Sequence, residues 1–158
     1  MDRGLRTNKK WFIYTGIAWT VLFAFMSFYW AAGGMIGVKS LGGEIYQKAL
    51  DRDQDFIPIV WGTGIIKLGG VVLLVLLLGK NLPQRIEKWL RLISIATGIF
   101  FALYGLMNFI TISLAAVNIL DFELDAYATK WRLMFWEPFW VLGGILYILS
   151  GKKSKVKN

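Results

Sequence analysis

The sequence predicts an all-α integral membrane protein: an antiparallel four-helix bundle, formed by a single domain over residues 1–158, with both termini in the cytoplasm. The first observation is composition, since 56% of the residues are apolar and 16% are aromatic. A soluble domain of this size could not bury that much apolar surface. The second is four apolar segments, each long enough to cross a bilayer. The third is that twelve of the eighteen Lys and Arg flank the segments on one side, which the positive-inside rule assigns to the cytoplasm.

The first helix is expected at about residues 11–34. A short basic stretch that ends at Lys10 precedes an uncharged run from Trp11 to Val38. This run is too long for the core of a signal peptide, so we expect it to be retained as a membrane helix. The glycines near its far end are expected to fray the helix there.

The second helix is expected at about residues 57–79, after a polar loop over residues 39–56. The loop sequence GGEIYQKALDRDQD has the pattern of a short surface helix. Pro58 stands in the first turn of the second helix, where proline is tolerated.

The third and fourth helices are expected at about residues 89–118 and 131–150. A tight basic turn precedes the third helix, and an acidic loop over residues 121–130 precedes the fourth. Pro138 is expected to kink the fourth helix, and residues 151–158 are expected to form a basic cytoplasmic tail.

Two charges lie deep in the predicted membrane helices. Lys67 is the one charge in the second helix and lies roughly 15 Å from its start, at ~1.5 Å per residue. At that depth a charge costs at least ~2.5–3.5 kcal/mol, so we expect it to face protein or water and to have a partner. Glu137 in the fourth helix is the expected partner, directly or through one water. A structural ion pair and a functional pair both remain open.

Each predicted helix carries one face of polar, small and aromatic residues at spacings of three and four. The third helix has the clearest face, and five of its six members are polar: Ser94, Thr97, Phe101, Tyr104, Asn108 and Thr111. Such faces are typical of close helix packing in lipid, and four of them together could instead line an interior site.

The interior-site interpretation places a ligand-binding site in the outer half of the bundle. Its candidate residues are Tyr29, Trp30, Lys67, Tyr104, Asn108, Glu137 and Trp140. One base, one acid, an amide and aromatic walls are the makeup of a small-ligand site, and we expect a cavity of at least ~300 Å³. The simpler alternatives are packing or interface roles for the two tryptophans and an interhelical hydrogen bond for the amide.

Several classes of function are not expected. The chain has no Cys and no His, so thiolate chemistry and most zinc sites are excluded. No phosphate loop or dinucleotide-binding fingerprint is present, and we expect neither a metal nor a cofactor. The net charge of +8 does not indicate nucleic-acid binding, because the basic residues flank the apolar segments, where they meet lipid head groups.

The motif FYWAAGG at Phe28–Gly34 resembles that of a family of small bacterial membrane proteins, the domain of unknown function family 3995. The resemblance implies four membrane helices and a location in the bacterial cytoplasmic membrane, and it implies no reaction. Tyr104 and Asn108 stand where the family is expected to carry Arg and Asp, and Ser27 stands where His is frequent.

Three functional hypotheses follow. The leading one is a multi-pass membrane protein that binds or transports a small amphipathic or lipid-like ligand. The second is a non-catalytic accessory subunit that packs against a membrane protein partner. The third is a membrane enzyme that acts on a lipid-soluble substrate, with Glu137 as acid/base; the sequence identifies no catalytic residue beyond that and leaves enzymatic activity open.

Overall fold

The computed structural model describes residues 3–79, 82–121 and 124–152, and these ranges contain helices and no strand. Four helical stretches are long and apolar enough to cross a membrane. They are α1 (Arg3–Ala31), α3 (Phe56–Leu76), α4 (Gln84–Ala116) and the continuous stretch formed by α5 (Ala126–Trp131), η2 (Arg132–Trp136) and α6 (Glu137–Gly151). The length and composition of these helices are those of a membrane-embedded protein.

The short elements lie in the polar segments. A 3₁₀ turn, η1 (Val38–Ser40), and the helix α2 (Gly43–Leu50) follow α1, and α2 occupies the segment predicted as a surface helix. The last helical stretch starts at Ala126, five residues before the predicted start. The Asp125 side chain accepts a hydrogen bond from the Ala128 amide at 3.0 Å, which caps that start.

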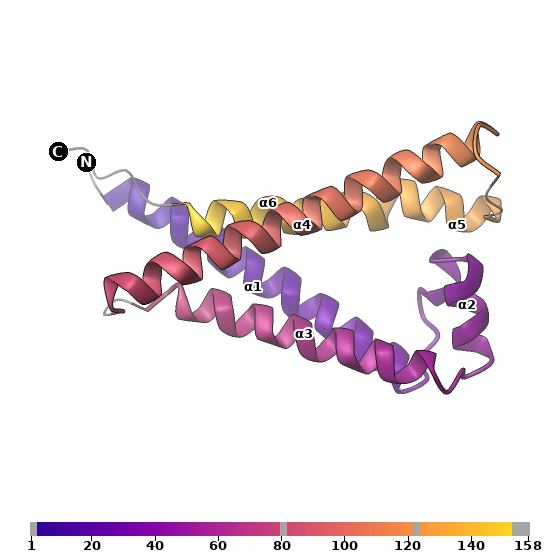
Figure 1. Ribbon diagram of the computed structural model, residues 1–158, viewed down its shortest axis with the longest axis horizontal. Coiled ribbons are helices and arrows are strands. Elements are labelled where there is room, and N and C mark those ends of the chain that lie inside the picture. The colour runs from indigo at the N-terminus through magenta and orange to yellow at the C-terminus, as the bar shows by residue number, and fades with distance from the viewer. Residues whose placement is uncertain (1–2, 80–81, 122–123, 153–158) are drawn as a thin grey trace.

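The long helices form two pairs. Figure 1 shows α1 beside α3 and α4 beside α6, and the two pairs meet where α1 packs against α6. By contrast, α3 and α4 follow each other in the chain and make little contact. The start of α1 and the end of α6 lie at one end of the molecule, here called the terminal end. The opposite end holds α2 and α5 and is called the loop end.

Glycines allow α4 and α6 to pack closely. A Cβ atom added at Gly98 would lie 2.6 Å from the carbonyl oxygen of Gly144, and one added at Gly144 would lie 2.6 Å from the carbonyl oxygen of Gly98. Across the same seam, the Ser94 hydroxyl donates a hydrogen bond to the carbonyl of Tyr147 at 2.8 Å. This is the packing expected where lipid gives no hydrophobic driving force between helices.

A cluster of aromatic side chains joins α1 to α6. Trp19, Phe23, Trp136 and Tyr147 are all buried. The Trp19 indole N–H donates to the carbonyl of Phe139 at 3.1 Å, so its polar atom is satisfied inside the apolar core.

The last helical stretch contains a π-helical segment, η2, immediately before Pro138. Proline has no N–H to donate, and its ring clashes with the carbonyl four residues earlier in a regular α-helix. The wider turn of η2 directly precedes that position, and such π segments are among the places where helices bend. The π-helical segment therefore lies beside the proline at which the sequence predicts a kink.

Candidate functional site

A groove separates α3 from α4, and its volume is about 770 Å³. Its floor includes Thr20 of α1 and Trp140 and Tyr147 of α6. The walls are residues of α3 and α4: Thr63, Ile66, Lys67, Gly69, Gly70 and Leu73 on one side, and Ile93, Ala96, Thr97, Phe100, Phe101 and Tyr104 on the other. The volume lies within the ~300–1,000 Å³ typical of small-molecule sites, and the lining is apolar with a few polar groups.

Lys67 is the charged residue of the groove lining. Its ammonium donates a hydrogen bond to the Ser27 hydroxyl at 2.6 Å and lies 5.1 Å from the centre of the Phe23 ring. Ser27 is buried and in turn donates to the Phe23 carbonyl. The Lys67 ammonium therefore contacts a hydroxyl oxygen and an aromatic ring. None of the three ion pairs in the described part of the chain includes Lys67.

The predicted direct contact between Lys67 and Glu137 is wrong. Glu137 is instead bound by Arg132, whose Nε and Nη2 atoms each lie 2.8 Å from the same carboxylate oxygen. The helix pairing explains part of the difference, since α3 packs on α1 while α6 packs on α4 and α1.

The π-helical turn η2 explains the other part of the difference, which is why Arg132 contacts Glu137. In η2 the backbone N–H of Glu137 binds the carbonyl of Arg132, five residues earlier. This i→i+5 pattern brings the two side chains together, whereas a regular α-helix places residues five apart on different faces.

Glu137 lies outside the groove lining, and its side chain is buried. Its second carboxylate oxygen has no hydrogen-bond partner among the described residues. The acid that the enzyme hypothesis relied on is therefore held in the protein interior by Arg132 and does not face the groove.

Tyr29 and Trp30 also lie away from the groove, at the end of α1. The Tyr29 hydroxyl accepts a hydrogen bond from the amide of Ile36, and the Trp30 indole donates to the carbonyl of Ile36 at 2.8 Å. Both aromatic side chains therefore hold the turn that follows α1.

The glycines of the same motif end the helix in a defined way. The Gly33 amide binds the carbonyl of Trp30, the Gly34 amide binds that of Tyr29, and Gly33 has a φ of 105°. These two bonds and the left-handed glycine make a Schellman motif. The fraying expected at these glycines is therefore replaced by an ordered cap.

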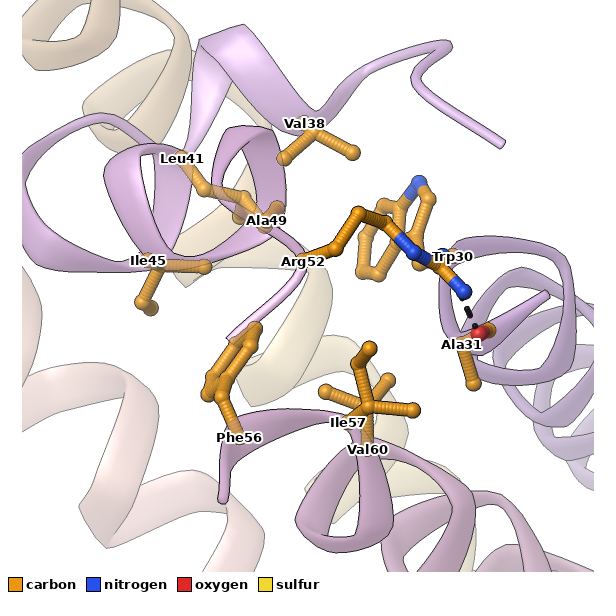
Figure 2. Close-up of a pocket in the computed structure, with 10 residues that line it drawn as sticks. All are labelled: Trp30, Ala31, Val38, Leu41, Ile45, Ala49, Arg52, Phe56, Ile57 and Val60. Atoms are coloured by element: carbon orange, nitrogen blue, oxygen red, sulfur yellow. Dashed lines mark hydrogen bonds between the residues drawn. The ribbon is translucent and has the colours of Figure 1, made fainter. Parts of the chain in front are cut away.

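Figure 2 shows a second cavity beside this cap, lined by residues of α1, η1, α2 and α3 and of the loops that join them. Arg52 reaches across it and donates to the carbonyl of Ala31 at 3.3 Å, which supplies a cation to the last turn of α1. The cavity holds about 30 Å³, room for one or two water molecules rather than a ligand.

Among the described residues, Asn108 makes no interhelical hydrogen bond of the kind considered from the sequence. Its amide donates to the carbonyl of Tyr104, one turn earlier on the same helix, at 2.9 Å. Tyr104 and Trp140, in contrast, both line the groove, and their rings contact each other where α4 packs on α6, with ring centres 5.1 Å apart. The groove lining thus includes Lys67, Tyr104 and Trp140, and the other four candidate residues lie outside it.

The position of the groove also differs from the expectation. On α3 it runs from Thr63 to Leu73, and on α4 from Ile93 to Tyr104. These are the middle of the helices and the part nearer the terminal end, rather than the half beside α2 and α5 that we took as the outer half.

Comparison with known proteins gives one relationship. The family described as "Protein of unknown function (DUF3995)" matches residues 20–147, which is most of the chain and includes every residue that lines the groove. Neither the curated proteins nor the solved structures contain a match. On the strength of the family match, this chain is a member of the DUF3995 family.

Proposed function

We propose that the groove between α3 and α4 binds a small amphipathic or lipid-like ligand, and that ligand binding or transport is the function of this protein. One observation carries the proposal: an opening of about 770 Å³ contains one cation, and the described chain gives that cation no acidic partner. An interhelical seam built only for packing has no use for either feature.

The rim of the groove supports access from the bilayer. Ile66 and Phe100, on opposite walls, are 75% and 64% exposed. In a membrane such side chains face lipid tails, so an amphipathic molecule could move sideways from the bilayer into the groove without crossing water.

The proposed setting is the cytoplasmic membrane of a bacterium, with the bundle antiparallel and both termini in the cytoplasm. The distribution of Lys and Arg supports this orientation, and the exposed Trp11 and Trp89 at the terminal end are typical interface anchors. The lipid bilayer is then the source of the ligand.

The test uses two glycines of α3 that offer the same space. A Cβ atom added at Gly69 or at Gly62 would meet nothing within 4 Å, so both positions have open space where a side chain would begin. Gly69 lines the groove and Gly62, two turns away, does not. Gly69→Phe should therefore fill the groove, and Gly62→Phe is the matched control.

The readout is quenching of tryptophan fluorescence by dibromostearyl alcohol and dibromostearic acid added to the protein in lipid nanodiscs. Trp140 lines the groove, and its share of the quenching is the part lost in Trp140→Phe. We expect a saturable component of quenching in the unmodified protein and in Gly62→Phe. It should be lost in Gly69→Phe and in Trp140→Phe. Saturable quenching that persists in Gly69→Phe, or that is absent for both probes, would refute binding in the groove.

The accessory-subunit hypothesis has one observation in its favour. Gly69 and Ala96 on facing walls are small, and small residues let a neighbouring helix approach closely. A defined complex that survives mild detergent and is lost in Gly69→Phe, together with no saturable quenching, would favour a partner helix over a ligand.

A further inference from the structure

We infer that the ligand of this groove is a long-chain carboxylic acid from the bilayer, bound with its ionised carboxylate on Lys67 and its chain toward the open side of the groove. The inference rests on the proposed function and adds the chemical class of the ligand. It is carried by the placement of donors and charges around the groove.

The first step is the unmet charge of Lys67. An ammonium has three donors, and here one of them is used by the Ser27 hydroxyl. The described part of the chain supplies no carboxylate to it. In a low-dielectric interior a cation interacts strongly with any anion that reaches it, so the groove favours a negatively charged ligand.

The second step is the wall opposite Lys67. Thr97 and Tyr104 of α4 line the groove, and their hydroxyls have no hydrogen-bond partner among the described residues. Both are donors. A carboxylate has two oxygens, so one could accept from the Lys67 ammonium while the other accepts from this wall.

The third step is the number of charges. Lys67 is the charged residue of the lining, so the groove offers one positive charge. A carboxylate carries one negative charge, whereas a phosphomonoester carries about 1.5 to 2 and would leave part of its charge uncompensated. The groove therefore matches a carboxylate better than a phosphate.

The fourth step is depth. Lys67 lies eleven residues after the start of α3 at Phe56, about 16 Å along the helix axis, close to the middle of a bilayer core of about 30 Å. A head group must travel that far into hydrocarbon. A carboxylic acid can do so in its neutral form and lose its proton to water as the carboxylate binds the Lys67 ammonium, whereas a permanently charged head group meets the full cost of desolvation.

The experiment compares two probes that differ only in the head group, dibromostearic acid and dibromostearyl alcohol, in phosphatidylcholine nanodiscs at pH 8. We expect the acid to bind at least about tenfold more tightly than the alcohol, the advantage of a charge-assisted hydrogen bond. Lys67→Met should bring the two affinities to within about twofold. Lys88→Gln, which removes an exposed positive charge at the start of α4, should keep the preference.

A second variant tests the opposite wall and does not depend on the behaviour of Lys67→Met. Thr97→Val keeps the shape of the side chain and removes one free hydroxyl, and the preference for the acid should fall by about threefold to tenfold. The helical content of each variant, measured by circular dichroism, checks its fold.

The results separate this inference from the proposed function. Equal, saturable binding of acid and alcohol that is lost in Gly69→Phe would refute the carboxylate and leave ligand binding intact. A preference for the acid that survives both Lys67→Met and Thr97→Val, or tighter binding of a dibromoalkyl phosphate, would also refute it. Failure of both probes to saturate would refute the proposed function itself.

Discussion

Replacing Arg132 with methionine is expected to destabilise the protein strongly, although Arg132 is not part of the groove. Methionine keeps the length and apolar character of the arginine stem and removes the guanidinium. The guanidinium supplies both polar contacts of the Glu137 carboxylate that the described residues provide, through Nε and Nη2, each at 2.8 Å.

The magnitude follows from the burial of Glu137. Glu137 is 2% exposed, and its second carboxylate oxygen has no hydrogen-bond partner among the described residues. Arg132→Met therefore leaves a buried carboxylate without compensation, which costs about 3–5 kcal/mol. Replacing Arg132 and Glu137 together, as Arg132→Met with Glu137→Gln, removes the charge as well as its partner and should cost much less than Arg132→Met alone.

Equilibrium unfolding in mixed detergent micelles, followed by tryptophan fluorescence, measures these free energies. A double-mutant cycle of Arg132 and Glu137 should show a coupling of at least about 1 kcal/mol, whereas a cycle of Lys67→Met and Glu137→Gln should be additive within about 0.5 kcal/mol. Coupling between Lys67 and Glu137, or additivity between Arg132 and Glu137, would refute the assignment of Arg132 as the partner.

Two further predictions concern topology and packing. Because the chain has no cysteine, single introduced cysteines can report its topology. Gln54→Cys should react with an impermeant maleimide added outside the cell, and Gln84→Cys should not. The reverse pattern would overturn the proposed orientation. Ser40, in the loop after α1, is unsuitable as a probe because it is buried and accepts a hydrogen bond from Trp136, and Ser154 in the tail lies outside the described residues. Gly144→Ala should lower the stability by about 1–3 kcal/mol, because its Cβ would meet backbone atoms of Gly98 and Ala102 at 2.6 Å. Gly62→Ala is the control and should leave the stability unchanged. Equal melting temperatures for the two variants would contradict the close packing of α4 on α6.

Much of the fold could be predicted from the sequence because membrane helices are specified by length and apolarity. The four membrane helices fall within a few residues of their predicted positions, apart from the earlier starts of α1, α4 and the last stretch. The polar face predicted for the third helix includes Thr97, Phe101 and Tyr104, which line the groove. These faces follow from the period of the helix alone.

The partner of Glu137 could not be predicted in the same way. Sequence gives the depth of a residue along its helix but not the direction in which the helix faces, and a π-helical turn changes that direction for everything after it. Arg132 stands five residues before Glu137, a spacing that a regular helix would not bring together. The one signal in the sequence was Pro138, which marks where the backbone departs from regular geometry.

The close packing of α4 on α6 has a clearer signal in the sequence. Gly98 and Gly105 stand seven residues apart, two turns of one helix, and both are buried against α6. The predicted polar face, which includes Thr97 and Tyr104, lies beside this glycine face. The helix therefore uses two neighbouring faces, one for packing on α6 and one for the groove.

The cap at the end of α1 has an evolutionary consequence. A Cβ atom added at Gly34 would lie 2.2 Å from the ring of Tyr29, so the glycine is required by the aromatic side chain that covers it. Substitutions at these two positions should therefore be correlated among homologues: a lineage that loses the aromatic ring at position 29 is released from the need for glycine at position 34. The glycine and the aromatic residue would then be inherited together as parts of one turn, and ligand preference could diverge at Lys67 and the facing wall while that turn stays the same.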